Sequence, residues 1–220
     1  MTTDVTQKCM RKVSQSRSIE TKEALIEAAT QLFAEKGFHK VNTKEIAKAA
    51  GVAIGSFYGY YTDKKQVFLE IVKTYKEALL GAGMCGNSDD FDKANPGQDY
   101  TLEQVINYFI NQKIEVAERY PLAFHLEINH MRYRDEEVAA LLEDYTQREI
   151  TIFINYMSRY SDLLRVDDLQ LAASVIYQVN DNMIMAHLSG GNTKHAQSLI
   201  NEYKTMIALY LLKGNKESTV

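Results

Sequence analysis

The stretch around residue 50 holds side chains that are suited to contact a nucleic acid. Thr43 and Lys44 stand at the start of a predicted helix, where unpaired N–H groups and the helix dipole favour a phosphate. About ten residues later, Ala53, Ile54 and Ser56 are short enough for a second helix to approach the edges of bases. The chemistry that this stretch predicts is therefore binding rather than catalysis.

Local signals predict the helices that would position these side chains. Asn42 and Glu45 have the spacing of a capping box, and Gly51 stands where a helix usually ends in a left-handed residue. The second helix is expected to be about two turns long. Asp63 and Gln66 form another capping pair, which begins a third helix. Two short helices joined by a tight turn are typical of a helix-turn-helix, whose second helix enters the major groove.

This stretch resembles the DNA-binding domain of the TetR (tetracycline-repressor-like) regulators. The resemblance covers about residues 20–75 and is carried by these residues: Ala28-Ala29, Leu32-Phe33-Ala34-Glu35-Lys36-Gly37-Phe38, Ile46-Ala47, Ala50-Gly51-Val52, Gly55-Ser56-Phe57-Tyr58, Tyr60-Tyr61, Asp63-Lys64 and Phe68-Leu69. It implies an all-α, dimeric transcription regulator with an N-terminal DNA-binding domain and a C-terminal effector-binding domain. The rest of the chain matches this family only in its helical layout.

The resemblance also implies roles for single residues. Contacts with bases are expected at Ala53, Ile54, Gly55 and Ser56, contacts with the DNA backbone at Thr43 and Lys44, and contacts with phosphate at Tyr58, Tyr60 and Lys64. Ala53 and Ile54 carry no hydrogen-bond donor, so specificity is expected from thymine methyl contacts, Lys44 and DNA shape. Phe57 and Tyr61 are expected to face inward. A solvated lysine at Lys44 and aromatic packing at Tyr58 are the alternatives.

Composition favours an all-α protein that lies outside a membrane. The 220 residues include only 2 Pro and 11 Gly, and many segments carry helical periodicity. No run of apolar residues is long enough to cross a bilayer, and no apolar signal core follows Met1. Cys9 and Cys85 alone indicate a reducing compartment, so a cytoplasmic location is expected. A redox-sensing cysteine pair is the alternative.

The charge distribution fits DNA binding by the N-terminal third alone. The net charge is −4, but residues 1–75 hold 12 Lys and Arg against 8 Asp and Glu, whereas residues 76–220 hold 13 against 21. One basic part and one acidic part are expected where a single module contacts phosphates.

The chain divides into four parts and about nine helices. We expect a flexible basic arm at 1–17, the helix-turn-helix domain with a linking helix at 18–80, a loop at 81–100 and a helical effector-binding and dimerisation domain at 101–215. The arm is either a solubilising tail or a source of further DNA contacts. Five helices are expected in the last part. Thr101 with Gln104 is expected to cap the first of them, and Asp167 with Gln170 the fourth.

The middle helices are rich in aromatic residues and methionine, with a few polar residues among them. Such a mixture is typical of a pocket for a small apolar or aromatic molecule. The candidate effector contacts are Phe109, Phe124, His125, Met131, Tyr145, Phe153, Tyr156, Tyr177, Asn180 and Asp181. Packing of the core alone would produce the same pattern.

The last two predicted helices carry wide apolar faces. In the family that the chain resembles, such a pair meets its twin across a two-fold axis, and a C2 dimer places two reading helices on a palindrome. The candidate interface residues are Ile176, Met183, Leu199, Tyr203, Met206 and Tyr210. The alternative is that both faces complete the core of one protomer.

Catalytic and metal-binding patterns are absent from the sequence, so neither a cofactor nor a metal is expected. Glu127-Ile128-Asn129-His130 has the Glu-x-x-His spacing of di-iron bundles, but such sites need the motif twice and two further glutamates. No Ser-His-Asp set, phosphate-binding glycine loop or zinc spacing occurs. The sequence thus predicts a ligand-responsive repressor of a palindromic operator. The alternatives are a regulator of the same family without a small effector, and an α-helical enzyme or carrier.

Overall fold

Helices make up nearly all of the structure. The computed structural model describes residues 3–82, 101–191 and 193–214, and for residues 3–16 the backbone only. These ranges contain nine α-helices and no strand, so the expected all-α fold is confirmed. The elements are α1 Thr3–Lys36, η1 Phe38–Lys40, α2 Thr43–Ala49, α3 Ile54–Tyr60, α4 Lys64–Ala82, α6 Leu102–Ala117, α7 Leu122–Arg132, α8 Glu136–Met157, η2 Ser158–Leu163, α9 Leu169–Gly190 and α10 Lys194–Leu211. None of these described helices is long and apolar enough to cross a bilayer.

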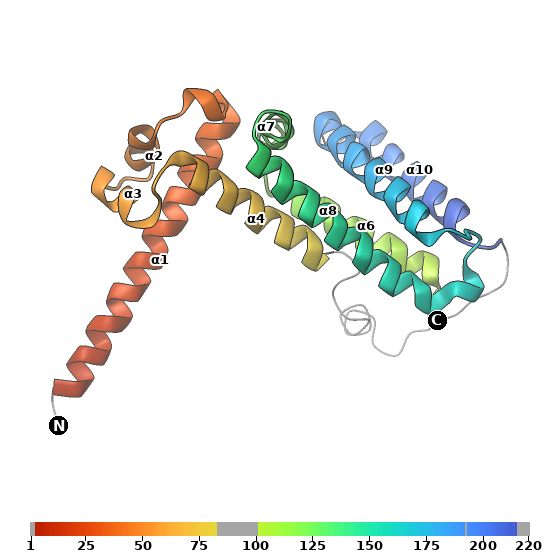
Figure 1. Cartoon of the computed structure of the whole chain (residues 1–220), viewed down its shortest axis with the longest axis horizontal. Coiled ribbons are helices and arrows are strands. Elements are labelled where there is room, and N and C mark those ends of the chain that lie inside the picture. Colours follow the sequence, from red (N-terminus) through yellow and green to blue (C-terminus); the bar gives the residue numbers. More distant parts are fainter. Residues whose placement is uncertain (1–2, 83–100, 192, 215–220) are drawn as a thin grey trace.

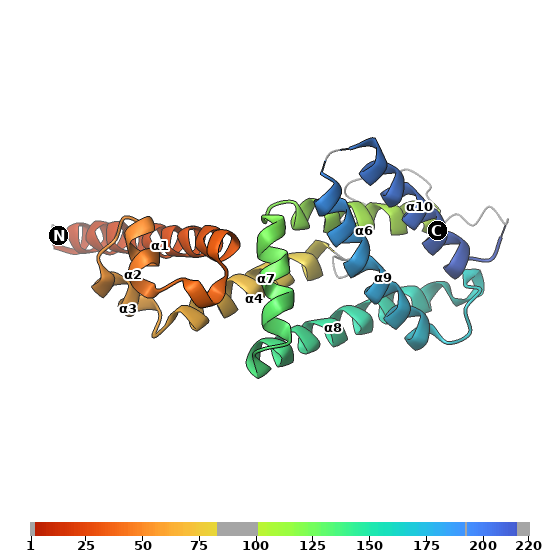
Figure 2. The ribbon, with the colours of Figure 1, turned by 90° about the horizontal axis from the view of Figure 1, so that it is seen from above.

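The helices form two groups that α4 connects. Helices α1 to α3 lie at one end of the molecule and α6 to α10 at the other, while α4 runs from the first group into the second (Figure 1). Seen from above, α7 lies across the junction between the groups (Figure 2), and it packs against α1, α8 and α9. Helix α7 is therefore an element through which the C-terminal group contacts α1.

Capping explains where several helices begin. Asn42 caps α2 and Thr101 caps α6, each with a complete capping box, as expected for Asn42 with Glu45 and for Thr101 with Gln104. The prediction for α9 was wrong by one residue, because the side chain of Asp168, not Asp167, accepts the N–H of Leu171 at 2.8 Å.

The N-terminal arm differs from the expectation. We expected a flexible segment at 1–17, but the backbone from Thr3 onward is part of α1, which extends well beyond α2 and α3 (Figure 1). The expected loop at 81–100 falls almost wholly on residues outside the described ranges, as does Cys85.

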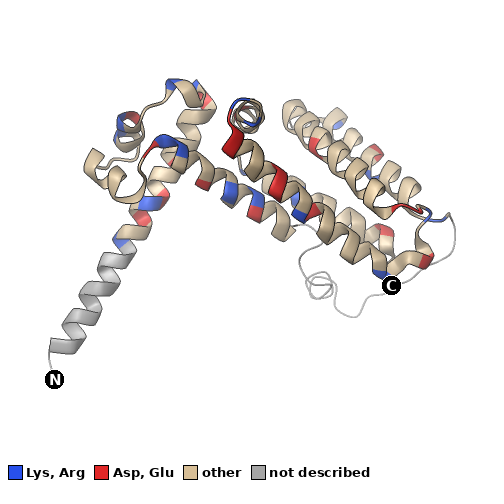
Figure 3. Cartoon of the chain, in the orientation of Figure 1, with Lys and Arg blue, Asp and Glu red and all other residues tan. Residues whose placement is uncertain are grey.

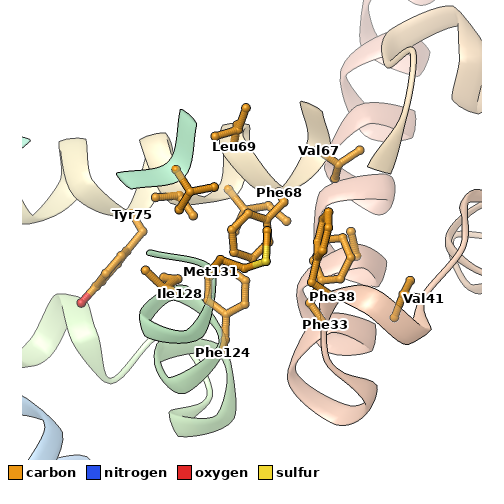
Figure 4. Close-up of a cluster of buried hydrophobic side chains, with 14 of the residues drawn as sticks. Phe33, Phe38, Val41, Val67, Phe68, Leu69, Tyr75, Phe124, Ile128 and Met131 are labelled. Atoms are coloured by element: carbon orange, nitrogen blue, oxygen red, sulfur yellow. The ribbon is translucent and has the colours of Figure 1, made fainter. Parts of the chain in front are cut away.

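One hydrophobic core joins the two groups of helices. Phe33 of α1, Phe38 of η1 and Phe68 of α4 meet with ring centroids 5.3–5.5 Å apart, and Phe124 of α7 lies 5.9 Å from Phe68 (Figure 4). Met131 of α7 belongs to the same buried cluster. The core of the DNA-binding helices is thus continuous with that of the C-terminal group.

A second core lies between α6, α8, α9 and α10. Its largest members are apolar side chains of all four helices, among them Phe109, Tyr156, Met183 and Tyr203. The two cavities described below lie among the helices that surround this core and α7.

Candidate DNA-binding surface and ligand cavities

Helices α2 and α3 form a helix-turn-helix. Two hydrogen bonds of 3.0 Å close the capping box between Asn42 and Glu45, and Lys36 of α1 contacts Glu45 at 2.9 Å. These contacts hold the pKa of Glu45 below its ordinary value, chiefly through the hydrogen bond from Lys36. Gly51 ends the first helix with a φ of 69°, which a residue with a Cβ rarely adopts. The predicted turn at Gly51 is therefore confirmed.

Helix α3 has one buried side and one exposed side. Phe57 and the adjoining Tyr61 are buried, as predicted, and fix the helix to the core. Ala53, Ile54, Gly55, Ser56, Tyr58 and Gly59 are exposed. Helix α3 carries no charged residue, whereas lysines lie on α2 and on the turn before it (Figure 3). The exposed side is thus shaped for close approach to base edges, with cations beside it.

The two predicted tyrosine hydroxyls have different surroundings. Tyr58 is 56% exposed, and its hydroxyl lies 3.1 Å from that of Thr43 on α2, so the two residues form one polar edge. The Tyr60 hydroxyl donates its hydrogen to the carbonyl oxygen of Ser18 at 3.0 Å. Tyr60 therefore fixes α3 to α1, and this contact competes with the expected role in phosphate binding.

The two predicted lysines also differ. Lys44 is exposed at the start of α2. Lys64 instead donates to the carbonyl oxygens of Phe38, His39 and Val41 at 2.7, 3.2 and 2.7 Å. An ammonium group has three N–H donors, so all of them are used. Burial lowers the pKa of Lys64. The expected contact of Lys64 with phosphate does not fit this geometry, and its role here is to hold the 38–41 turn.

Glu127 of α7 contacts the same turn from the other side. Its Oε1 accepts the N–H of Phe38 at 2.7 Å, and its Oε2 lies 3.8 Å from Nδ1 of His130. Sequence reasoning considered Glu127 and His130 as a metal-binding spacing and as polar groups among the aromatic residues of the middle helices. Among the described residues no cluster of three or more potential metal ligands occurs. The one sequence signal for this role is that Glu127 stands three residues after buried Phe124, because residues with this spacing lie on the same side of a helix.

A first cavity lies between α4, α6, α8, α9 and α10, and its free volume is about 80 Å³. On this measure one water molecule needs about 10–15 Å³, so there is room for a small ligand. Four predicted effector contacts line it, namely Phe109, Phe153, Tyr177 and Asn180. Ile176 and Tyr203, which we expected at a dimer interface, line it as well.

An ion pair forms the polar part of the first cavity. Nζ of Lys113 lies 2.5 Å from Oε2 of Glu149, and Glu149 is buried. Burial would raise the pKa of Glu149, but the charges of Lys113 and Lys76 outweigh it and hold this pKa below its ordinary value. The carboxylate is therefore ionised, and the cavity offers an apolar wall with one charged corner.

A second, smaller cavity lies between α4, α7, α8 and α9. Its lining combines polar with apolar residues. The polar residues are Tyr75, Lys76, His125, Asn129, Arg132 and Asp181, and the apolar residues are Ile128, Leu142 and Met185. His125 and Asp181 were predicted effector contacts. Burial lowers the pKa of His125, so its ring is neutral at pH 7, and its Nε2 donates to the carbonyl oxygen of Ala117 at 3.0 Å.

The remaining four predicted effector residues line neither cavity. Phe124 and Met131 belong to the core that joins α7 to α1 and α4 (Figure 4). The Tyr145 hydroxyl donates to Glu77 of α4 at 2.7 Å, and Tyr156 packs in the second core against Phe109. Their aromatic and methionine character reflects core packing, which was the alternative interpretation.

Comparison with known proteins identifies the family of the N-terminal domain. The family model for bacterial regulatory proteins of the tetR family matches residues 25–71, which hold the helix-turn-helix described above. Residues 25–71 thus carry the DNA-binding domain of the TetR family.

Several curated relatives of this chain are named as HTH-type transcriptional regulators or repressors. The repressor BepR of Brucella suis is 37% identical over 97 residues, which cover 42% of this chain and 43% of BepR. The chain thus matches at most about half the length of these curated relatives. Two solved structures share the fold over most of both chains. Salmonella enterica GusR has a TM-score of 0.64 at 22% identity and covers 87% of this chain and 95% of its own. A Saccharomonospora viridis regulator in complex with choline has a TM-score of 0.65 at 14% identity and covers 88% and 98%.

The predicted interface residues divide between the inside and the surface of the protomer. Met183 and Tyr203 are buried within the protomer, and Ile176 and Tyr210 are half-buried. Leu199 and Met206 of α10 are exposed. Sequence reasoning missed three further exposed apolar residues on these helices: Leu171 and Val175 of α9 and Leu209 of α10. Helices α9 and α10 thus have a buried inner face, which completes the core of the protomer, and an exposed apolar outer face, which is available for a dimer interface.

Proposed function

We propose that this chain is a homodimeric TetR-family repressor, which a small apolar or aromatic effector releases from a palindromic operator. The observation that carries the proposal is the exposed side of α3, where small side chains lie in the open while Phe57 and Tyr61 fix the helix from behind. The relative BepR, which is named as a repressor, supports the direction of regulation. Such a regulator would act in the cytoplasm, without a cofactor.

The two groups of helices would divide the work. Residues 18–80 would bind the operator, and residues 101–215 would bind the effector and dimerise. On the DNA side, Ala53, Ile54, Gly55 and Ser56 would face bases, while Thr43, Lys44 and Tyr58 would contact phosphates. Tyr60 and Lys64 would support this surface from behind, because their donors are used within the protein.

The first cavity supports control by a small molecule. It is apolar apart from its ion pair, and α4 contributes both to this cavity and to the core beneath the DNA-binding helices. A protein of the same fold has been solved with choline bound. Coupling of about 1–3 kcal/mol between effector and operator would lower DNA affinity by roughly 5–150-fold.

The test is a fluorescence anisotropy titration against the DNA upstream of the chain's own gene, at two salt concentrations. Binding should be nanomolar, sensitive to salt and orders of magnitude tighter than to a scrambled duplex. Equally weak binding to both duplexes, with turnover of a small molecule instead, would favour an α-helical enzyme.

Replacing Lys44 by Ala should weaken operator binding and relax base preference. The exposed ammonium at the start of α2 would be lost, so the slope of log affinity against log salt should fall by about 1 for one lost phosphate contact. The matched control is Lys73→Ala, which removes an exposed lysine from α4, outside the helix-turn-helix. Equal affinities and slopes in wild type and Lys44→Ala would remove Lys44 from the interface.

Replacing Leu209 by Glu should convert the dimer into a monomer. Leu209 is 65% exposed within the protomer, and a charge there would be buried without a partner if α10 met its twin. Light scattering should give a mass of 25.1 kDa, which is that of one chain. Operator affinity should fall as well, because the dimer is lost. Gln197→Glu, an exposed change on another side of α10, should leave the dimer intact. A dimer in the Leu209→Glu variant would place the interface elsewhere.

A further inference from the structure

Lys76 of α4 is buried without a hydrogen-bonding partner. Its exposed fraction is 6%, and among the described residues it forms neither a hydrogen bond nor an ion pair. Its Nζ lies over the ring of Tyr75, 5.8 Å from the ring centroid. Lysine is almost never fully buried unless it is paired, because an ammonium that leaves water loses a large solvation energy. An anion in the second cavity would supply the missing partner.

The surroundings of Lys76 carry an excess of positive charge. Arg132 of α7 lines the same cavity and also has no partner among the described residues. Asp181 of α9 is the one carboxylate in the lining, and it forms no ion pair with either cation. His125 is neutral. The charge of Lys76 also reaches the buried carboxylate of Glu149 and helps to lower its pKa, but the ion pair of Glu149 is formed with Lys113, so these two charges cancel. Two cations facing one carboxylate leave a net charge of about +1, which one anion would neutralise.

The size of the second cavity limits what can enter it. Its free volume is about 20 Å³, room for one or two water-sized groups such as the two oxygens of a carboxylate. Asn129 adds an amide that can donate a hydrogen bond. A carboxylate fits this space and this donor set, and the apolar remainder of such a ligand has the first cavity nearby. Lys76 and Asp181 line the second cavity. Leu80 and Tyr177, which lie one helical turn from them on α4 and α9, line the first cavity.

We propose that the second cavity binds the carboxylate of an apolar organic acid, with Lys76 and Arg132 as its cationic partners. The inference names the chemical class of the effector, and only its regulatory consequence rests on the proposed function. A carboxylate drawn toward Arg132 would act on α7, whose Glu127 holds the Phe38 N–H. The bound acid would thereby act on the turn before the helix-turn-helix.

The test compares octanoate with 1-octanol by calorimetry on the full-length wild type and on Lys76→Met, which keeps the length of the side chain. Octanoate should bind at least about 10-fold more tightly than octanol, and Lys76→Met should lose that advantage while its affinity for octanol stays unchanged. Lys73→Met, an exposed change on the same helix, should behave as wild type. Absence of octanoate binding, equal affinity for both probes, or full octanoate affinity in Lys76→Met would each overturn the inference.

Two further measurements separate this inference from a structural role and from the proposed function. Lys76→Met should melt at the same temperature as the wild type or above it, since a buried unpaired charge is removed. If it melts lower, Arg132→Gln should show the same selective loss for octanoate, and an unchanged octanoate affinity there would overturn the inference. Operator binding is measured on the same samples. Octanoate that binds through Lys76 and leaves DNA affinity unaltered would uphold the site and contradict effector control.

Discussion

Replacing Phe68 by Ala is expected to lower the free energy of unfolding by about 3–5 kcal/mol. Phe68 is fully buried in α4, and its ring meets Phe33, Phe38 and Phe124 with centroids 5.3–5.9 Å away. Truncation would remove contacts to α1, to η1 and to α7 at once and would leave a cavity at their junction. A loss of this size is a large part of the 5–15 kcal/mol that stabilises a typical protein.

Denaturant unfolding followed by circular dichroism measures this loss. Because one core joins the two groups of helices, both should unfold in one transition that shifts as a whole. Phe68→Leu, which keeps most of the volume, should cost less, and Leu126→Ala, at a 47% exposed position of α7, should change stability by only about 0.5 kcal/mol. A variant in which the N-terminal helices melt first, at unchanged stability of the rest, would show that the core does not couple them.

The sequence predicted those parts of the fold that depend on neighbours along the chain. Capping boxes at Asn42 and Thr101, the turn at Gly51 and the inward side of α3 all follow from spacings of a few residues, and the structure confirms them. The shift from Asp167 to Asp168 at α9 shows the limit of such signals, since either carboxylate has an N–H three residues ahead of it.

The roles that depend on distant parts of the chain could not be predicted. Lys64 is held by carbonyls of residues 38–41, more than 20 positions earlier, and nothing in its own neighbourhood indicates this. Phe124 and Met131 have the residue types of a ligand pocket, but their helix turns that face toward α1 and α4. The aromatic pattern shows which residues are buried and leaves open whether a protein side chain or a ligand lies opposite them.

The second large effect is expected at Glu127, where Glu127→Ala should reduce stability by about 1–3 kcal/mol. The substitution leaves the Phe38 N–H, now bonded to Oε1 at 2.7 Å in a partly buried site, without an acceptor. The loss should also loosen the turn before α2, so operator affinity should fall and respond less to an effector. Thermal melting and anisotropy titration on one preparation measure both effects.

Two companion variants separate the hydrogen bond from the charge. Glu127→Gln keeps an oxygen that can accept the Phe38 N–H, so it should recover most of the stability while losing the negative charge. His130→Ala removes the 72% exposed neighbour that lies 3.8 Å from the same carboxylate and should leave both measurements unchanged. If Glu127→Ala instead melted like wild type, the contact would contribute nothing, and α7 would have to act on the helix-turn-helix through the aromatic core alone. In that event Phe68→Leu, and not Glu127→Ala, should be the variant that weakens the response to effector, because the core would then be the sole connection between α7 and α1.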